Sequence, residues 1–169
     1  MASQSSPQRR AGRRFDSLEQ EAYLHLWRTY DRLKAIEDEL FETFRLSAQQ
    51  YNTLRLLRAA APEALTVQGL ATRLISRAPD MTRLLDRLEE RDLIERTRRV
   101  GNRRIVDVSL TDAGRGLLDE LAELVRKCHH QQLGHLSDAQ LRALIDLLSA
   151  ARGPHEDADS HWQSPPRST

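Results

Sequence analysis

The stretch MTRLLDRLEERDLIERTRRVGNRRIVDVSL, Met81 to Leu110, decides the fold because its hydrophobic period changes halfway along. Its first half places apolar residues at the i, i+3, i+4, i+7 spacing of an amphipathic helix: Met81, Leu84, Leu85 and Leu88. Its second half ends in the apolar–polar alternation of a strand, and Gly101-Asn102 can supply a turn before it. Since Pro79 fits only a first turn, we predict a helix from about Pro79 to Arg91 and then a β-hairpin of residues 93–98 and 104–110.

Helices are predicted on both sides of this stretch. Three helix starts carry the capping-box pattern: Ser17–Gln20, Ser47–Gln50 and Ser137–Gln140. With the apolar periodicity, these starts predict helices over about 17–44, 47–60, 66–74, 111–133 and 137–152. The order of elements is then α-α-α-α-β-β-α-α, a mainly α fold with one β-hairpin.

The bulk composition excludes several classes of protein. Among 169 residues, 26 basic and 25 acidic side chains nearly cancel, so a basic surface has to come from local clustering. The single cysteine excludes an internal disulfide and fits a cytoplasmic location. No apolar run approaches the ~18 residues of a membrane span, and MASQSSPQRRAGRR lacks the apolar segment of a secretory signal. No G-x-S-x-G, H-E-x-x-H or Gly-rich phosphate loop is present, so we predict neither an enzyme nor a cofactor.

The hairpin concentrates positive charge. Five arginines lie around its turn with no acidic residue among them: Arg96, Arg98, Arg99, Arg103 and Arg104. Their mutual repulsion is a cost unless an anion compensates it, and the outward face of the preceding helix is basic as well. A short helix, a helix and a hairpin form the layout of a winged helix-turn-helix, whose later helix enters the major groove of DNA. We therefore predict double-stranded DNA as the partner, with solvated basic surfaces as the alternative.

The run Leu65–Gly114 resembles the DNA-binding core of the MarR family of bacterial transcription regulators. The resemblance rests on TRLLDRLEERDLIER, a hairpin and VSLTDAG in that order, and the flanking helices extend it over about Phe15 to Arg152. It implies an obligate-type homodimer of winged helix-turn-helix lobes, built on long terminal helices. It also implies a repressor that binds a pseudo-palindromic operator and is released by a small, possibly aromatic ligand. The alternative is a helical dimeric module that binds an acidic partner protein.

The resemblance assigns roles to individual residues. The expected recognition-helix residues are Arg77, Pro79, Thr82, Arg83 and Arg87. The expected wing residues are Arg98, Arg99, Asn102, Arg103 and Arg104, of which Arg104 matches the arginine that enters the minor groove. Thr66 and Ser76 are expected to contact the DNA backbone.

Two departures from the family pattern stand out. The family wing usually reads Asp-x-Arg, whereas Asn102-Arg103-Arg104 stands here, so the usual Asp–Arg pairing is lost while Asn102 can still accept one hydrogen bond. Asp92 occupies the position after the recognition helix where the family commonly has glycine, and aspartate tolerates a left-handed backbone less well than glycine.

The resemblance also implies a ligand pocket between the dimerisation helices and the DNA-binding lobe. We expect its lining to include His25, Trp27, Tyr30 and Tyr51, and the alternative is that these aromatic residues belong to the core. The segment CHHQQLGH is a poor zinc site because Cys128 and His135 lie two helical turns apart. Cys128 continues a leucine stripe, which favours packing, so we predict no metal.

Together these patterns divide the chain into five parts. We predict disordered tails in residues 1–14, which are basic, and in residues 153–169. Between them we predict an N-terminal dimerisation helix in residues 15–46, the winged helix-turn-helix domain in residues 47–110 and C-terminal dimerisation helices in residues 111–152.

Overall fold

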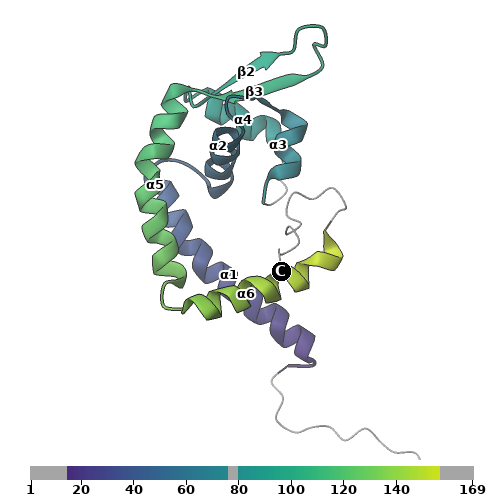
Figure 1. Cartoon of the computed structure of the whole chain (residues 1–169), viewed down its shortest axis with the longest axis vertical. Coiled ribbons are helices and arrows are strands. Elements are labelled where there is room, and N and C mark those ends of the chain that lie inside the picture. Colours follow the sequence, from purple (N-terminus) through teal and green to yellow (C-terminus); the bar gives the residue numbers. More distant parts are fainter. Residues whose placement is uncertain (1–14, 76–79, 157–169) are drawn as a thin grey trace, which may run out of the picture. The chain divides into compact units, whose positions relative to one another are not determined.

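The computed structural model describes residues 15–75 and 80–156 (Figure 1). These residues form two compact units that divide inside the first helix, between Ala35 and Ile36. The helices are α1 (Leu18–Thr43), α2 (Ala48–Ala60), α3 (Val67–Arg73), α4 (Met81–Glu89), α5 (Asp112–Leu133) and α6 (Asp138–Arg152), followed by a 3-10 turn, η1 (Gly153–His155). The strands are β1 (Leu65–Thr66), β2 (Ile94–Arg98) and β3 (Val106–Leu110). The predicted order of helices and hairpin strands is confirmed, and β1 is an addition to it.

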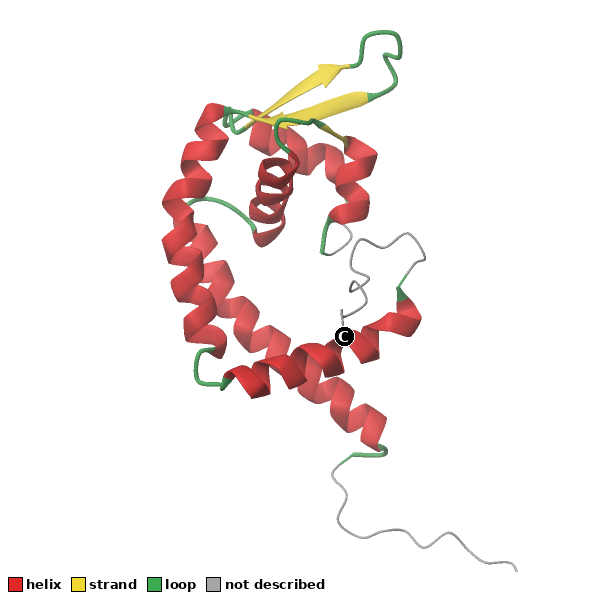
Figure 2. Cartoon of the chain, in the orientation of Figure 1, coloured by secondary structure: helices red, strands yellow, loops and turns green. Residues whose placement is uncertain are grey.

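The three strands form one antiparallel sheet in the order β1-β3-β2 (Figure 2). Ile94 pairs with Leu110 and Arg98 with Val106, which sets the register of the predicted hairpin. Leu65 pairs with Val108 and closes the other edge of the sheet. Strand β1 could not be predicted from the sequence, because two residues are too few to show an alternation of apolar and polar side chains.

Leucines from α2, α3 and α4 meet the sheet in a single core. The buried members include Leu54, Leu57, Leu70, Leu85, Leu88, Val108 and Leu118. In α4 the residues Leu84, Leu85 and Leu88 are buried, as the helical stripe predicted. The core also takes in Phe41 from the end of α1. The packed side of α4 is therefore fixed, and this fixes which side of the helix faces outward.

Helix α4 begins two residues later than predicted. Its N-cap is Asp80, whose carboxylate accepts a hydrogen bond from the Arg83 backbone N–H at 2.9 Å, and the first helical residue is Met81. The predicted start at Pro79 is therefore too early, because the Asp80 side chain caps the helix by accepting from a first-turn amide. Pro79 itself lies outside the described residues.

Two of the three predicted capping boxes are complete. Ser47 and Gln50 exchange both bonds, as do Ser137 and Gln140. At the start of α1 the Ser17 hydroxyl accepts from the Gln20 N–H at 3.1 Å, but the Gln20 side chain accepts from the Asp16 N–H at 2.8 Å instead of from Ser17. The predicted helix start is confirmed and the reciprocal bond is displaced by one residue.

The chain leaves α4 through a left-handed residue. Asp92 has φ 56°, and the Leu93 N–H donates to the Leu88 carbonyl at 3.0 Å. This backbone conformation is the one for which the family commonly uses glycine. The carbonyl of Asp92 also accepts the Thr111 hydroxyl at 2.6 Å. Asp92 thus joins the end of α4 to the start of α5.

Gly114, in the first turn of α5, packs closely against the backbone of Leu93. A Cβ atom on Gly114 would lie 2.2 Å from the Leu93 carbonyl oxygen, so only glycine permits the observed packing. Further along α5, Leu118, Leu121, Val125 and Cys128 are buried, which confirms that the cysteine continues the leucine stripe. Burial raises the pKa of the Cys128 thiol, and nearby Glu37 raises it further.

Candidate nucleic-acid interface

The outward face of α4 carries polar and cationic side chains. Thr82, Arg83 and Arg87 are exposed, opposite the buried leucines of the same helix. Within the described residues neither arginine has an acidic side chain within ion-pairing distance. Two cations and one hydroxyl are therefore available on one helix face. The expected recognition-helix residues Arg77 and Pro79, and the expected backbone contact Ser76, lie outside the described residues.

The tip of the hairpin is a closed, hydrogen-bonded loop. The Arg99 N–H donates to the Ile105 carbonyl at 3.0 Å, and Ile105 N–H donates to the Asn102 carbonyl at the same distance. Gly101 has φ 88°, a backbone conformation that glycine adopts without strain, and it makes the turn that was predicted here. The side chain of Asn102 accepts the Arg104 N–H at 3.2 Å, as expected from the sequence. The asparagine therefore orders the backbone that carries Arg104.

Two of the five hairpin arginines have acidic partners, which contradicts the expectation of an uncompensated cluster. Arg99 forms two hydrogen bonds to Asp107, of 2.9 and 2.6 Å. These bonds lower the pKa of the Asp107 carboxyl. Arg99 and Asp107 are eight residues apart in sequence. The antiparallel pairing of β2 with β3 brings them together, because it places Asp107 opposite Thr97, two residues before Arg99. The Arg99–Asp107 pair takes the place of the Asp–Arg pairing that the wing sequence lacks.

Arg96 turns away from the tip and binds α4. Its guanidinium lies 2.7 Å from the Asp86 carboxylate and donates through Nε to Glu89 at 2.9 Å. A second hydrogen bond joins its Nη2 to Glu89. These bonds lower the pKa of Glu89. Arg96 thus ties α4 to the hairpin.

The remaining three hairpin arginines are exposed. Over residues 15–75 and 80–156, Arg98, Arg103 and Arg104 have no acidic side chain within ion-pairing distance. Val100, at the turn, is 99% exposed. The tip therefore presents three cations and one apolar side chain to solvent.

Thr66 has a structural role at the start of α3. Its hydroxyl oxygen accepts the Gly69 N–H at 2.9 Å, and the residue is half-buried beside β3. A hydroxyl that accepts this bond keeps its proton free to donate, so a contact to a phosphate stays a prediction.

The four residues expected to line a ligand pocket differ in burial. Tyr51 stacks on Phe41, with ring centroids 4.6 Å apart, and packs against the core, which is the alternative the sequence left open. His25, Trp27 and Tyr30, on the first part of α1, are exposed within the single chain, Trp27 by 60% and Tyr30 by 61%. These three rings are therefore outside the core of the single chain, and the pocket stays a prediction.

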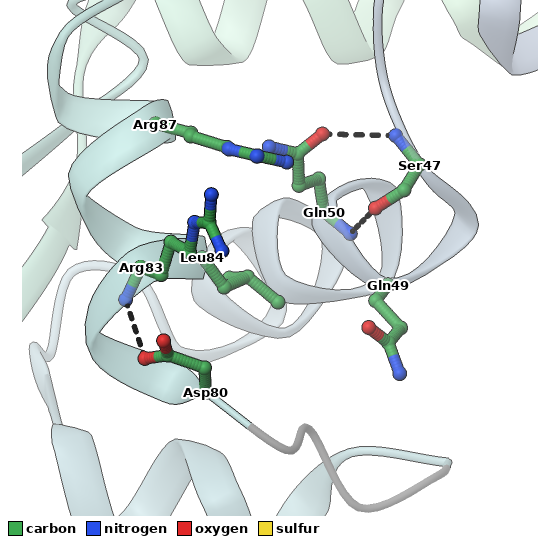
Figure 3. A pocket seen from close by; sticks show the side chains of 7 residues that line it. All are labelled: Ser47, Gln49, Gln50, Asp80, Arg83, Leu84 and Arg87. Carbon is green, nitrogen blue, oxygen red and sulfur yellow. Dashed lines mark hydrogen bonds between the residues drawn. The ribbon is translucent and has the colours of Figure 1, made fainter.

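A cleft does lie between α2 and α4. It is lined by Ser47, Gln49, Gln50, Asp80, Arg83, Leu84 and Arg87 (Figure 3). In the sequence, Ser47 and Gln50 belong to a capping box and the two arginines lie on a separate predicted helix. Only the packing of α2 against α4 brings them together.

Metal sites and membrane-spanning helices were also considered for the described part of the chain. Among residues 15–75 and 80–156, no group of three or more His, Cys, Asp or Glu side chains could hold a metal ion. None of the helices in these ranges is long and apolar enough to cross a membrane.

Comparison with known proteins gives consistent similarities. The model of the MarR family matches residues 46–106. The HTH-type transcriptional regulator PecS of Dickeya dadantii is 33% identical over 112 residues, which cover 64% of this chain and 68% of PecS. The crystal structure of a MarR transcription factor from Planctomyces limnophilus is 60% identical, with a TM-score of 0.65, and the match covers 81% of this chain and 99% of that one. Bordetella bronchiseptica BpsR, whose DNA binding is regulated by 6-hydroxynicotinic acid, is 27% identical, with a TM-score of 0.68 over 85% of this chain and 99% of BpsR.

Proposed function

Because this chain belongs to the MarR family of DNA-binding transcription regulators, we propose that it binds a pseudo-palindromic operator as a homodimer and represses transcription. The observation that carries the proposal is the pair of cationic surfaces, one on α4 and one at the hairpin tip, that have no acidic partners in the described part of the chain. Phosphate contacts supply most of the sequence-independent affinity for DNA, and they need such cations.

On this proposal α4 enters the major groove. Arg83 and Thr82 lie in its first turn, where a recognition helix contacts base edges, and an arginine can make two hydrogen bonds to guanine. The hairpin then lies along the backbone with Arg104 in the minor groove, and the Arg99–Asp107 pair braces it. Arg98 and Arg103 contact phosphates.

The dimer is proposed from apolar surface that one chain leaves uncovered. Helix α6 has no buried residue, although Ile145 and Leu147 are 58% and 70% exposed. Separately, α1 exposes Leu26, Trp27 and Tyr30. Apolar helix faces of this kind need a partner, and a second copy of the chain is the partner typical of a symmetric regulator.

We also propose that a small ligand releases the protein from DNA. The ligand-regulated relative BpsR supports it, as do the exposed aromatic residues of α1. A ligand releases the protein only if it binds better to a dimer geometry that fits DNA badly. We propose that His25, Trp27 and Tyr30 contact such a ligand in the dimer, and that the protein acts in the cytoplasm.

Footprinting of the DNA upstream of the gene tests this function. We expect two protected half-sites on one face of the duplex, with centres about 10 bp or a multiple of it apart. Protection of a single site, or none on any upstream fragment at low salt, would contradict the proposal and favour an acidic protein partner.

A further inference from the structure

We infer that Arg91 is a positioning residue for DNA recognition, which holds the end of α4 against the turn between α1 and α2. The inference rests on the proposed function, in which α4 enters the major groove and the segment that contains α1 takes part in the dimer. It adds to that function because Arg91 is not among the residues proposed to contact DNA. Through its contacts Arg91 keeps the α4 helices of the two subunits at the spacing of two half-sites.

Arg91 forms two hydrogen bonds to a segment that is distant in sequence. Its Nη1 donates to the Arg45 carbonyl at 2.8 Å, and its Nη2 donates to the Phe44 carbonyl at 3.1 Å. Phe44 and Arg45 follow α1 directly, since α1 ends at Thr43. The planar guanidinium carries its donors in a fixed fork, so it can bond two neighbouring carbonyls in one orientation. The contact thus joins the segment after α4 to the turn after α1.

The two segments that Arg91 joins share an uncommon backbone conformation. Arg45 has φ 53°, and Asp92, the residue after Arg91, has φ 56°. Over residues 15–75 and 80–156 these two are the non-glycine residues with positive φ. Such a residue is strained and persists where surrounding contacts fix it, which is frequent at functional sites. The bonds of Arg91 are contacts of this kind, and they connect the two turns.

The same junction extends to the start of α5. The Asp92 carbonyl accepts the Thr111 hydroxyl at 2.6 Å, and the Leu93 carbonyl accepts the Thr111 N–H at 3.3 Å. Thr111 is the N-cap of α5, and its hydroxyl oxygen accepts the Gly114 N–H at 3.0 Å. Hydrogen bonds therefore run from the turn after α1, through the end of α4, to the first turn of α5. The segments that contain α1 and α5 are both predicted to form the dimer, whereas α4 is proposed to contact bases.

Arg91 acts through geometry and not through its charge. Within the described residues it has no acidic side chain at ion-pairing distance, and both of its partners are neutral carbonyls. Arg91→Lys keeps the charge, but one ammonium nitrogen cannot occupy the places of two Nη atoms. Arg91→Gln removes both the charge and the fork. The two variants together therefore separate a geometric role from an electrostatic one.

The test compares an operator of two half-sites, as footprinting defines it, with a DNA fragment of the same length that holds one half-site. A dimer gains affinity from the second half-site only if both α4 helices can bind at once. We expect Arg91→Gln and Arg91→Lys to lower affinity for the operator by at least about tenfold, and affinity for the single half-site by less than about twofold. Arg55→Gln is the matched control, because it removes an equal charge from an exposed arginine that bonds Asn52 of its own helix. We expect this control to leave the ratio of the two affinities unchanged.

A second measurement does not depend on DNA. The Arg45 and Leu46 amides bond carbonyls in the last turn of α1, at 2.9 and 3.0 Å, so their hydrogen exchange reports how firmly the turn is held. We expect Arg91→Gln to speed this exchange by at least about fivefold. The Ala61 amide, at the far end of α2, should keep its rate.

Unchanged affinity of the folded variants for both DNAs would overturn the inference. Equal losses on the operator and on the half-site would overturn it as well, because they would identify Arg91 as a direct DNA contact. A loss with Arg91→Gln that is absent in Arg91→Lys would show that the charge acts, and would also contradict it. If the wild type binds no upstream fragment, the proposed function fails, and the exchange of the Arg45 amide alone then decides whether Arg91 holds the turn.

Discussion

The proposed recognition of DNA depends on single side chains on two surfaces. Some are expected to contact bases and others to contact phosphates. Arg83 lies in the first turn of α4, where base edges are within reach. Arg104 lies at a turn whose backbone is ordered by Asn102. Their different positions predict different consequences when each is removed.

Replacement of Arg83 by alanine should reduce specificity. If its guanidinium bonds to a base, the loss on the cognate operator is about 1–3 kcal/mol, with a much smaller loss on scrambled DNA. Fluorescence anisotropy with both DNAs measures the difference. Equal losses on the two DNAs would show that Arg83 contacts phosphate alone.

Replacement of Arg104 by alanine should weaken binding to every sequence. Each lost phosphate neutralisation lowers the slope of log K against log salt by about 0.9, and we expect one such loss. The measurement is the same titration at several salt concentrations. An unchanged slope would remove Arg104 from the interface.

Among the helices and strands, Arg96 and Gly114 hold α4 and the segment after it against the hairpin and α5. Arg96 bonds Asp86 and Glu89 of α4, and Gly114 lets α5 approach the loop after α4. Both contacts lie beyond the helix face proposed for DNA. Substitutions at Arg96 or Gly114 should therefore lower the stability of the protein more than its affinity for DNA.

The Arg96 contact predicts a pH-dependent contribution to stability. Because Arg96 lowers the pKa of Glu89, the folded protein favours the ionised carboxylate, and this stabilisation is present above the ordinary Glu value of 4.5. It is lost as the pH falls through the lowered folded pKa. We expect Arg96→Gln to reduce the free energy of unfolding by about 1 kcal/mol at pH 7, and by less below pH 4.5. Denaturant unfolding at several pH values checks this, and a difference that grows on acidification would refute it.

Gly114 and Gly116 form a matched pair on α5. A Cβ at Gly114 would meet the Leu93 carbonyl at 2.2 Å, whereas one at Gly116 would meet nothing within 4 Å. We expect Gly114→Ala to destabilise the protein by about 1–3 kcal/mol, and Gly116→Ala to stabilise it by roughly 0.5–1 kcal/mol. Thermal and denaturant unfolding of both variants give the comparison. Similar effects from the two substitutions would contradict the close approach at Leu93.

These elements also show which features of the fold and the candidate site can be predicted from local sequence. Helix α4 and the hairpin follow from periods of 3.6 and 2 within one stretch, so the sequence predicted them without tertiary information. Strand β1 was missed because it is defined by its pairing with Val108, which is distant in sequence. The pairing of Arg99 with Asp107 and the cleft at Gln50 were missed for the same reason, since each depends on register or helix packing.

The whole molecule, as a regulator that binds a two-fold site, needs a second chain. No residue of α6 is fully buried within one chain, and its exposed residues Ile145 and Leu147 cost free energy if they stay in water. The symmetry of a homodimer also matches the expected symmetry of the operator. Dimerisation and operator binding should therefore be lost together.

The single variants Ile145→Glu and Leu147→Glu test this coupling, because residues two apart point to nearly opposite sides of a helix. A charge on the side that packs against the partner should shift the protein to monomers in sedimentation experiments and lower operator affinity by at least about tenfold. Arg142→Glu, on the same helix, is the control. If both variants stay dimeric, the interface lies elsewhere.

Sequence-specific DNA binding is best tested by salt-titrated fluorescence anisotropy of the wild-type protein on its own upstream DNA, with scrambled DNA of the same length as competitor. We expect salt-dependent binding on both DNAs, with upstream DNA bound at least about 10³-fold more tightly. Equal affinity for the two DNAs on every upstream fragment, or affinity that does not change with salt, would contradict a sequence-specific regulator that contacts DNA through these arginines.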